Sequence, residues 1–371
     1  MILTPLFRLM VEKRASALFF TAGAPIQIKI AGEITPIDSR ILDSCAIRSI
    51  AYECMTPERI RHFETHFESN FSMVEPGVGS FRINVFSQRA TFAMVIRLIR
   101  WNIPSVEELR LLPRLKELVT EKRGLIIVAG TTGSGKSSTL AAMINHRNQT
   151  MSGHILTIED PIKFMYKHAK SIVNQREIGV DTWTYNDALA SAMREAPDVI
   201  LIGESRDSET FRTALAYSQT GRLCLTALHA INTYHALSRI INFFPQEVRK
   251  TLLLDLSVSL RAIISLRLVR DTQGALCPAS EILINTTHIQ ELIRKGEIDH
   301  IKDAMEQSLA PGCQTFEQAL YGLYREGTIS LKEALAHADS ANNLAWLIDN
   351  AKPSGAVDAD GPGTETLSAL N

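Results

Sequence analysis

The sequence lacks the features that mark disulfide-rich, zinc-binding or membrane-spanning chains. Its 5 cysteines include no C-x-x-C pair, so we expect neither a disulfide framework nor a zinc cluster, and reduced thiols indicate a cytoplasmic protein. No run of about 18 uncharged apolar residues occurs, which excludes a helix that spans a membrane. The opening segment breaks its apolar run with Arg8, Glu12 and Lys13, which predicts an amphipathic helix and not a signal peptide.

An excess of charge of one sign is lacking too. The chain carries 39 Lys and Arg against 40 Asp and Glu, so its overall field is too weak to hold a nucleic-acid backbone. It also contains no recognisable nucleic-acid motif, and we expect no nucleic-acid partner. A length of 371 residues, with 45% hydrophobic and 21% charged residues, instead predicts a globular protein of two domains.

Apolar patterning divides the chain into an α+β part and an α/β part. Short strands are predicted within residues 15 to 35 and 77 to 100, with helical pattern over 44 to 66. We therefore expect a small α+β domain over residues 1–100, followed over 101–123 by a linker that carries one or two short helices. Over residues 124–285, short aliphatic runs alternate with helices, which predicts a mainly parallel sheet covered on both faces. Residues 286–350 are expected to be helical and 351–371 disordered.

The strongest motif is a glycine-rich loop of the form G-x-x-x-x-G-K-S/T, between the strand GLIIVA and a helix. Its glycines let backbone N–H groups surround a phosphate, while the helix N-terminus adds positive charge. Lys136 would reach the β- and γ-phosphates of ATP, and the Ser137 hydroxyl would ligate Mg²⁺. The alternative is a glycine turn that matches by chance, which the flanking strand and helix disfavour. The predicted nucleotide-binding residues are Gly130, Thr131, Thr132, Gly133, Ser134, Gly135, Lys136, Ser137 and Ser138.

Acidic residues follow two aliphatic strands of the α/β part. Glu204 lies just past the strand VILI, at the edge where open α/β sheets bind ligands, so it could organise Mg²⁺ or its waters. Glu159 and Asp160 end the strand HILTI, and one of them could orient or deprotonate the attacking water. Since neighbouring strand residues face opposite ways, at most one should face the nucleotide. The alternatives are a surface acid for Glu204 and an Asp-Pro turn at Asp160.

His229 ends a third such strand, LCLTAL. It could sense the γ-phosphate or an adjacent subunit. A histidine at a strand end is more often structural, so the residue alone decides little.

Four motifs in this order resemble those of the secretion-type ATPase superfamily. They are GTTGSGKSS as Walker A, TIEDPI as the Asp box, APDVILIGESRD as Walker B and TGRLCLTALHA as the His box. The segments SALFFTAGAP and GSFRINVFSQR resemble the PAS-like N-terminal domain of that superfamily. The missing tetracysteine motif argues against the extension and type II secretion branches. The chain thus resembles the type IV pilus retraction ATPase family, and its C-terminal helices resemble the PilU branch more than the PilT branch.

The resemblance implies a fold, an assembly and site residues. It implies a RecA-like ATPase domain and a homohexamer at the inner membrane that hydrolyses ATP to drive pilus retraction and twitching motility. The partners it implies are a PilT-like retraction ATPase and a membrane platform protein. ATP would lie between the nucleotide-binding domain of one subunit and the N-terminal domain of another. Glu159 and Glu204 match the acidic residues of the active site, His229 the second His-box histidine, and Arg82 and Arg97 arginines that approach the nucleotide. Without the resemblance, these arginines are polar-face strand residues.

Several positions depart from the family pattern. Lys163 reverses the charge of the Asp-box glutamate, and Arg222, Thr226, Ser205 and Ala17 replace other motif residues. Two functions therefore stay open, a motor ATPase and an ATP-binding, weakly hydrolysing accessory subunit. They differ in whether Lys163 and Arg222 point into the nucleotide site; Lys163 could also be a harmless surface change. A DNA-translocating ATPase shares the loop but finds no support in the charge.

Overall fold

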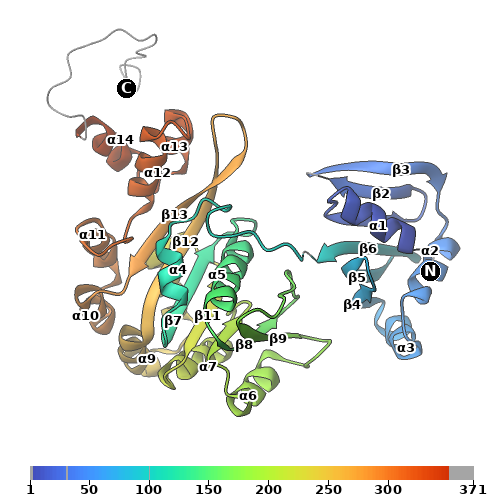
Figure 1. The fold of residues 1–371 in the computed structure, drawn as a ribbon, viewed down its shortest axis with the longest axis horizontal. Coiled ribbons are helices and arrows are strands. Elements are labelled where there is room, and N and C mark those ends of the chain that lie inside the picture. The colour runs from blue at the N-terminus through green and yellow to red at the C-terminus, as the bar shows by residue number, and fades with distance from the viewer. Residues whose placement is uncertain (1–2, 31, 100, 351–371) are drawn as a thin grey trace, which may run out of the picture.

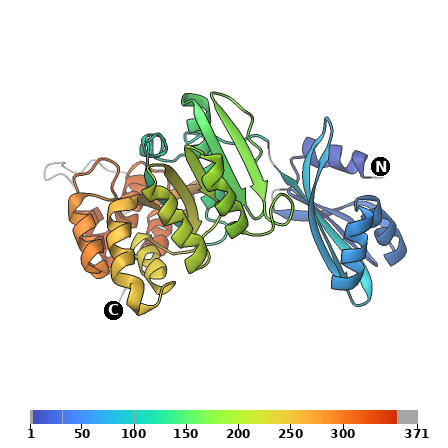
Figure 2. The same cartoon turned by 90° about the horizontal axis from the view of Figure 1, so that it is seen from below.

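The computed structural model describes residues 3–30, 32–99 and 101–350. It is a mixed α/β fold with two separate sheets, and the predicted largely parallel sheet is confirmed. Figures 1 and 2 show the smaller sheet at one end of the molecule and the C-terminal helices at the other, with the larger sheet between them. Within the described ranges, no helix combines the length and apolarity needed to cross a membrane.

The smaller sheet has six antiparallel strands. Its strands are β1 (Ala17–Thr21), β2 (Pro25–Ile30), β3 (Glu33–Ile41), β4 (Glu68–Glu75), β5 (Gly79–Gln88) and β6 (Thr91–Ile99). They lie in the order β3-β2-β1-β6-β5-β4, so the two ends of this segment are neighbours in the sheet. Its helices are α1 (Thr4–Glu12), α2 (Ser44–Glu53) and α3 (Pro57–His66). The predicted N-terminal helix is confirmed as amphipathic, because α1 buries Phe7 and Met10.

Alternation along β5 and β6 decides which residues of this sheet can meet a ligand. Phe81, Ile83 and Ile96 belong to the buried core under the helices. Arg82 and Arg97 have the opposite parity and are direct cross-strand partners, so they share the face away from that core. β3 and β4 were not predicted, because the residues of β3 are nearly all exposed and show no apolar alternation.

The larger sheet has seven strands in the order β13-β12-β7-β11-β10-β8-β9, all parallel except β13. They are β7 (Gly124–Gly130), β8 (Gly153–Glu159), β9 (Ser171–Glu177), β10 (Val199–Ile202), β11 (Leu223–Leu228), β12 (Leu260–Arg270) and β13 (Leu276–Ile284). The five helices that follow or separate these strands are α5 (Lys136–Thr150), α6 (Tyr185–Glu195), α7 (Ser208–Gln219), α8 (Thr233–Asn242) and α9 (Gln246–Ser259). Strands β9, β12 and β13 and helix α9 were not predicted.

Both faces of this sheet are buried, as the uninterrupted aliphatic runs predicted. In β7, Leu125 and Ile127 pack in one core with α6 to α9, while Ile126 and Val128 pack in the other with α5. Helix α4 (Arg114–Val119) of the predicted linker buries Leu115 in that second core. The linker therefore packs on the larger sheet. The division of the chain at residues 100, 123 and 285 stays a prediction, and the tail 351–371 lies outside the described residues.

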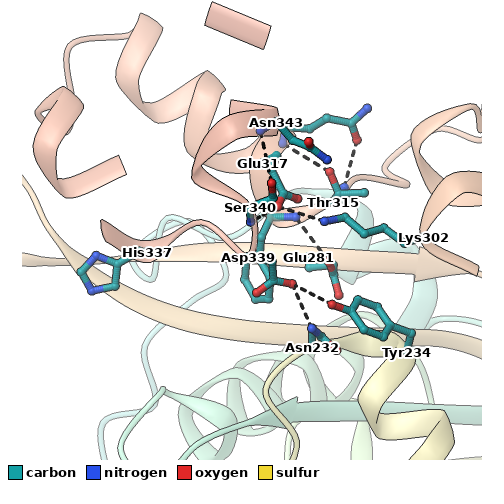
Figure 3. A network of polar contacts seen from close by, with 12 residues as sticks. Asn232, Tyr234, Glu281, Lys302, Thr315, Glu317, His337, Asp339, Ser340 and Asn343 are labelled. Carbon is teal, nitrogen blue, oxygen red and sulfur yellow. Dashed lines mark hydrogen bonds and ion pairs between the residues drawn. The ribbon is translucent and has the colours of Figure 1, made fainter. Parts of the chain in front are cut away.

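The C-terminal helices cover the far end of β12 and β13. They are α10 (Thr287–Lys295), a 3-10 turn (Ile298–His300), α11 (Ile301–Glu306), α12 (Phe316–Arg325), α13 (Leu331–His337) and α14 (Ala341–Asn350). Figure 3 shows the polar network that holds them. Glu281 of β13 accepts hydrogen bonds from the backbone N–H groups of Thr233 (2.6 Å) and Phe316 (3.4 Å). Asn232 donates to Asp339 at 2.9 Å, so these helices are tied to the segment just beyond His229.

Candidate nucleotide-binding site

The glycine-rich loop joins β7 to the first turn of α5. Gly135 precedes the helix with a φ of +99°, a left-handed conformation that favours glycine. At Gly130 a Cβ atom would lie 2.2 Å from Ser134 Oγ, so no side chain fits there. The Lys136 ammonium folds back over the loop and donates to the carbonyl oxygens of Gly130 and Thr131, both at 2.8 Å. The predicted loop thus forms a turn with a helix N-terminus and a lysine that can receive a phosphate.

Three predicted residues meet at the carboxyl edge of the sheet, because the strands that precede them, β7, β11 and β10, are neighbours and parallel. His229 Nε2 lies 2.7 Å from Glu204 Oε1, and His229 Nδ1 lies 3.4 Å from Lys136 Nζ. Burial, and then the Lys136 ammonium, lower the pKa of His229, which favours the neutral ring. A neutral histidine between an ammonium and a carboxylate joins the loop to the Walker B acid.

Glu159 and Asp160 occupy different surroundings, as the alternation along a strand predicts. Glu159 accepts a hydrogen bond from Thr157 Oγ1 at 2.9 Å, and burial raises its pKa to about 7. Asp160 lies 3.9 Å from Arg206 Nη1, a solvent-exposed contact. A carboxyl group that titrates near neutrality can take up a proton from water, so Glu159 is the better candidate base of the two.

Arg206 is a charged residue of this edge that the sequence reasoning did not single out. Its Nε donates to Glu204 Oε2 at 2.8 Å. Arg206 stands two residues after Glu204 in the quoted motif GESRD, and this short spacing was the signal that could have identified it.

Arg82 and Arg97 face the glycine-rich loop across an open cavity of about 800 Å³, lined also by Ser137, Ser138 and Lys163. Cavities of this size hold small-molecule ligands. Both arginines come from the same chain as the loop. The implied site between two subunits stays a prediction.

Glu177, at the end of β9, ties Arg82 to the larger sheet. Its buried carboxylate forms an ion pair with Arg82 and accepts hydrogen bonds from Ser72 Oγ (2.8 Å) and the backbone N–H of Ile162 (3.0 Å). Sequence reasoning missed Glu177, since it stands in no motif and its partners are 95 and 105 residues away.

The two charge departures lie at opposite ends of the site. Lys163 Nζ donates to Ser137 Oγ at 2.9 Å, inside the cavity. Arg222 precedes β11, and its carbonyl accepts from the backbone N–H of Gly124 at 3.0 Å. A six-residue strand separates it from His229, roughly 20 Å in extended geometry. Lys163 thus points into the candidate site, and Arg222 lies away from it.

The remaining departures are packed in the interior. Ser205 and Thr226 are both buried and hydrogen-bonded to each other at 2.9 Å between their hydroxyl oxygens. Each buried hydroxyl therefore has the other as its hydrogen-bond partner. Ala17 lies in β1 as the cross-strand partner of Arg97 and is also buried.

Ser137 and Glu204 are the oxygen donors predicted for Mg²⁺. Ser137 Oγ accepts from the Lys163 ammonium, and the Glu204 oxygens face Arg206 Nε and His229 Nε2. A divalent cation needs these lone pairs for itself. As arranged, the residues present do not fit Mg²⁺.

The parallel sheet, the glycine-rich loop at its carboxyl edge and the acids beside it define a phosphate-loop nucleotide-binding protein. A family model described as type II/IV secretion system protein matches residues 3–347. The type IV pilus ATPase PilU of Pseudomonas aeruginosa is 46% identical over 344 residues, which cover 92% of this chain and 90% of the relative. PilT of the same organism, a type IV pilus retraction ATPase, is 38% identical over 342 residues, covering 92% of this chain and 99% of the relative.

A solved structure agrees with these relatives. The crystal structure of the pilus retraction motor PilT with bound ADP superimposes with a TM-score of 0.86 at 40% identity, covering 92% of this chain and 98% of that one. The chain therefore belongs to the type II/IV secretion system protein family, and within it to the PilT/PilU-like ATPases. The resemblance stated from the motifs is confirmed.

Proposed function

We propose that this chain is an ATP-hydrolysing motor subunit that drives type IV pilus retraction and twitching motility, alongside a PilT-like ATPase. The observation that carries the proposal is the cavity in which Arg82 and Arg97 face Ser137 and Ser138 at the end of the loop. A smaller cavity shares Ser137 and is lined by Glu159 and Glu204, and His229 links Glu204 to Lys136. Hydrolysis of a phosphoanhydride needs a phosphate cradle, a base and cations that stabilise the transferred phosphoryl group. This arrangement supplies all three.

The chemistry divides among these residues. The loop N–H groups and Lys136 bind the β- and γ-phosphates, and Glu159 accepts a proton from the water that attacks the γ-phosphorus. ADP leaves as the γ-phosphoryl group is released as phosphate. His229 and Glu204 keep Lys136 oriented. The predicted Mg²⁺ would have to displace the Lys163 ammonium from Ser137, and no step is assigned to the metal.

Arg82 couples the chemistry to movement. In the structure its guanidinium pairs with Glu177, yet it lines the cavity beside the loop. A γ-phosphate competes for this guanidinium, because charge-assisted bonds from arginine to phosphate are strong. Exchange of Arg82 between Glu177 and phosphate would shift the smaller sheet against the larger one.

The assembly belongs to the proposal as well. We infer a homohexamer, a PAS-like N-terminal domain over residues 1–100, a RecA-like ATPase domain over 124–285, and a cytoplasmic location at the inner membrane through the pilus platform protein. The likeness to PilU and PilT supports these points. A C-terminal helical part over 286–350 completes the division.

Two measurements test this function. Cells that produce Lys136→Ala in place of the wild-type chain should lose pilus retraction under load and twitching. The purified Lys136→Ala oligomer should lose ATP hydrolysis. Normal retraction under load in cells that lack the chain would overturn the motor assignment.

One observation favours a second candidate, a nucleotide-binding accessory subunit that hydrolyses ATP weakly and couples to a PilT-like ring. Lys163 donates to Ser137 inside the cavity, where the family pattern has a glutamate. Negligible hydrolysis by the wild-type oligomer, with intact ATP binding and recovery in Lys163→Glu, would establish the accessory role.

A further inference from the structure

We propose that the Lys163 ammonium takes the place of a divalent metal ion beside Ser137, so that this chain binds a nucleoside triphosphate with little dependence on Mg²⁺. The inference rests on the proposed nucleotide site and adds to it a residue that sets its metal requirement.

The geometry beside Ser137 carries the argument. Ser137 is the second residue of α5, and in phosphate-loop proteins the hydroxyl at this position ligates the metal that bridges the β- and γ-phosphates. Lys163 Nζ lies 2.9 Å from Ser137 Oγ. A Mg²⁺ ion would lie about 2.1 Å from the same oxygen. The two cations would occupy overlapping space, and an ammonium with three donors can bridge phosphate oxygens as the metal would.

The segment that carries Lys163 is firmly held. The backbone N–H of Ile162 donates to Glu177 at 3.0 Å, and that of Tyr166 donates to Gln175 at 2.8 Å. Ile162, Phe164 and Tyr166 are buried, whereas Lys163 is exposed and lines the cavity. The alternation of these side chains therefore directs Lys163 toward the phosphate loop.

The acidic side chains near Lys163 do not neutralise all the positive charge of the site. Glu204 already faces Arg206 and His229, and Glu159 accepts from Thr157. Lys136 donates to two loop carbonyl oxygens and otherwise contacts His229, so none of these partners neutralises its charge. Two nearby ammonium groups, with Arg82 and Arg97 across the cavity, match the charge of a triphosphate that carries no metal.

Calorimetric titration of the full-length oligomer with ATP, once with excess EDTA and once with excess Mg²⁺, tests the proposal. The wild-type Kd should change by less than about threefold between the two conditions. Lys163→Met removes one charge-assisted hydrogen bond, so its Kd in EDTA should rise about 10-fold to 100-fold and recover with Mg²⁺. Lys163→Arg, which keeps the charge, should weaken binding in EDTA less than Lys163→Met does.

Lys167→Met is the matched control, because Lys167 is an exposed lysine of the same segment that does not line the cavity. It should behave as the wild type does in both conditions. A wild-type chain that binds ATP only with Mg²⁺ would overturn the role of Lys163 and leave the nucleotide site standing. A wild-type chain that binds ATP in neither condition would contradict the nucleotide site itself, and the inference with it.

Discussion

The two walls of the cavity are built in different ways. One wall contains Ser137 and Ser138, the end of the continuous loop from Gly130 to Ser138, whose shape follows from its glycines and the helix that it opens. The other wall presents Arg82 and Arg97 from two strands of a separate sheet. The residues of the first wall are neighbours in sequence. The residues of the second wall are brought to the site by tertiary contacts such as that of Arg82 with Glu177.

This difference suggests that the loop wall binds the nucleotide and that the arginine wall couples hydrolysis to movement of the two sheets. The loop wall consists of backbone donors and one lysine that bonds to its own loop, so it binds phosphate without a change of partners. The arginine wall depends on an ion pair that phosphate can replace. We therefore expect changes in the loop wall to abolish binding, and changes in the arginine wall to weaken turnover and the contact between the sheets.

The largest effect is expected from Lys136→Ala in the loop wall. Loss of the ammonium removes the charge-assisted bonds to the β- and γ-phosphates, and hydrolysis should fall by about 100-fold or more. Steady-state phosphate release by the purified oligomer measures this. Lys167→Met serves as the control. Undiminished turnover by Lys136→Ala would contradict the role of the loop wall in binding phosphate.

Glu159→Gln should lower hydrolysis by about 100-fold while ATP binding persists, because a general base contributes about that much. The pH profile gives a second test. Burial raises the pKa of Glu159 to about 7, and only the deprotonated carboxylate accepts a proton. Turnover should thus rise between pH 6 and 7 and level off above pH 8. A profile that falls over this range would argue against Glu159 as the base.

Arg82→Ala and Arg97→Ala should each reduce turnover by roughly tenfold, yet differ in stability. Removal of Arg82 leaves the buried Glu177 carboxylate without its cation, at a cost of about 3 kcal/mol in the free energy of unfolding. Arg97 forms no comparable ion pair within the described part of the chain, so Arg97→Ala should cost about 0.5 kcal/mol or less. Urea unfolding measures both. Equal losses would remove Glu177 as the link between the sheets.

The smallest effect is expected at the buried Ser205 and Thr226 pair. Ser205→Ala or Thr226→Val alone should cost about 1 kcal/mol, the net value of one hydrogen bond. The double variant should cost less than the sum, since neither hydroxyl is left without its partner. Strict additivity in this cycle, measured by urea unfolding, would mean that the pair does not act as a unit.

The same contrast explains what the sequence could predict. The α/β class and the loop depend on aliphatic runs and glycines that are neighbours in sequence, and both features are observed. Glu177 could not be found, because its contact with Arg82 spans 95 residues and depends on how the two sheets pack. Strand β3 escaped for another reason, since its exposed residues show no apolar alternation. Lys163 was recognised as a departure, but only its contact with Ser137 reveals its direction.

The most direct test of one site with two walls is steady-state ATP hydrolysis and ATP binding by the wild-type oligomer, Lys136→Ala and the double variant Arg82→Ala/Arg97→Ala. We predict that Lys136→Ala loses both activities, whereas the double variant keeps more ATP binding than Lys136→Ala does and loses at least about tenfold in turnover, since the effects of cross-strand neighbours need not add. A double variant that hydrolyses ATP at the wild-type rate would contradict the account, because the arginine wall would then take no part in the reaction.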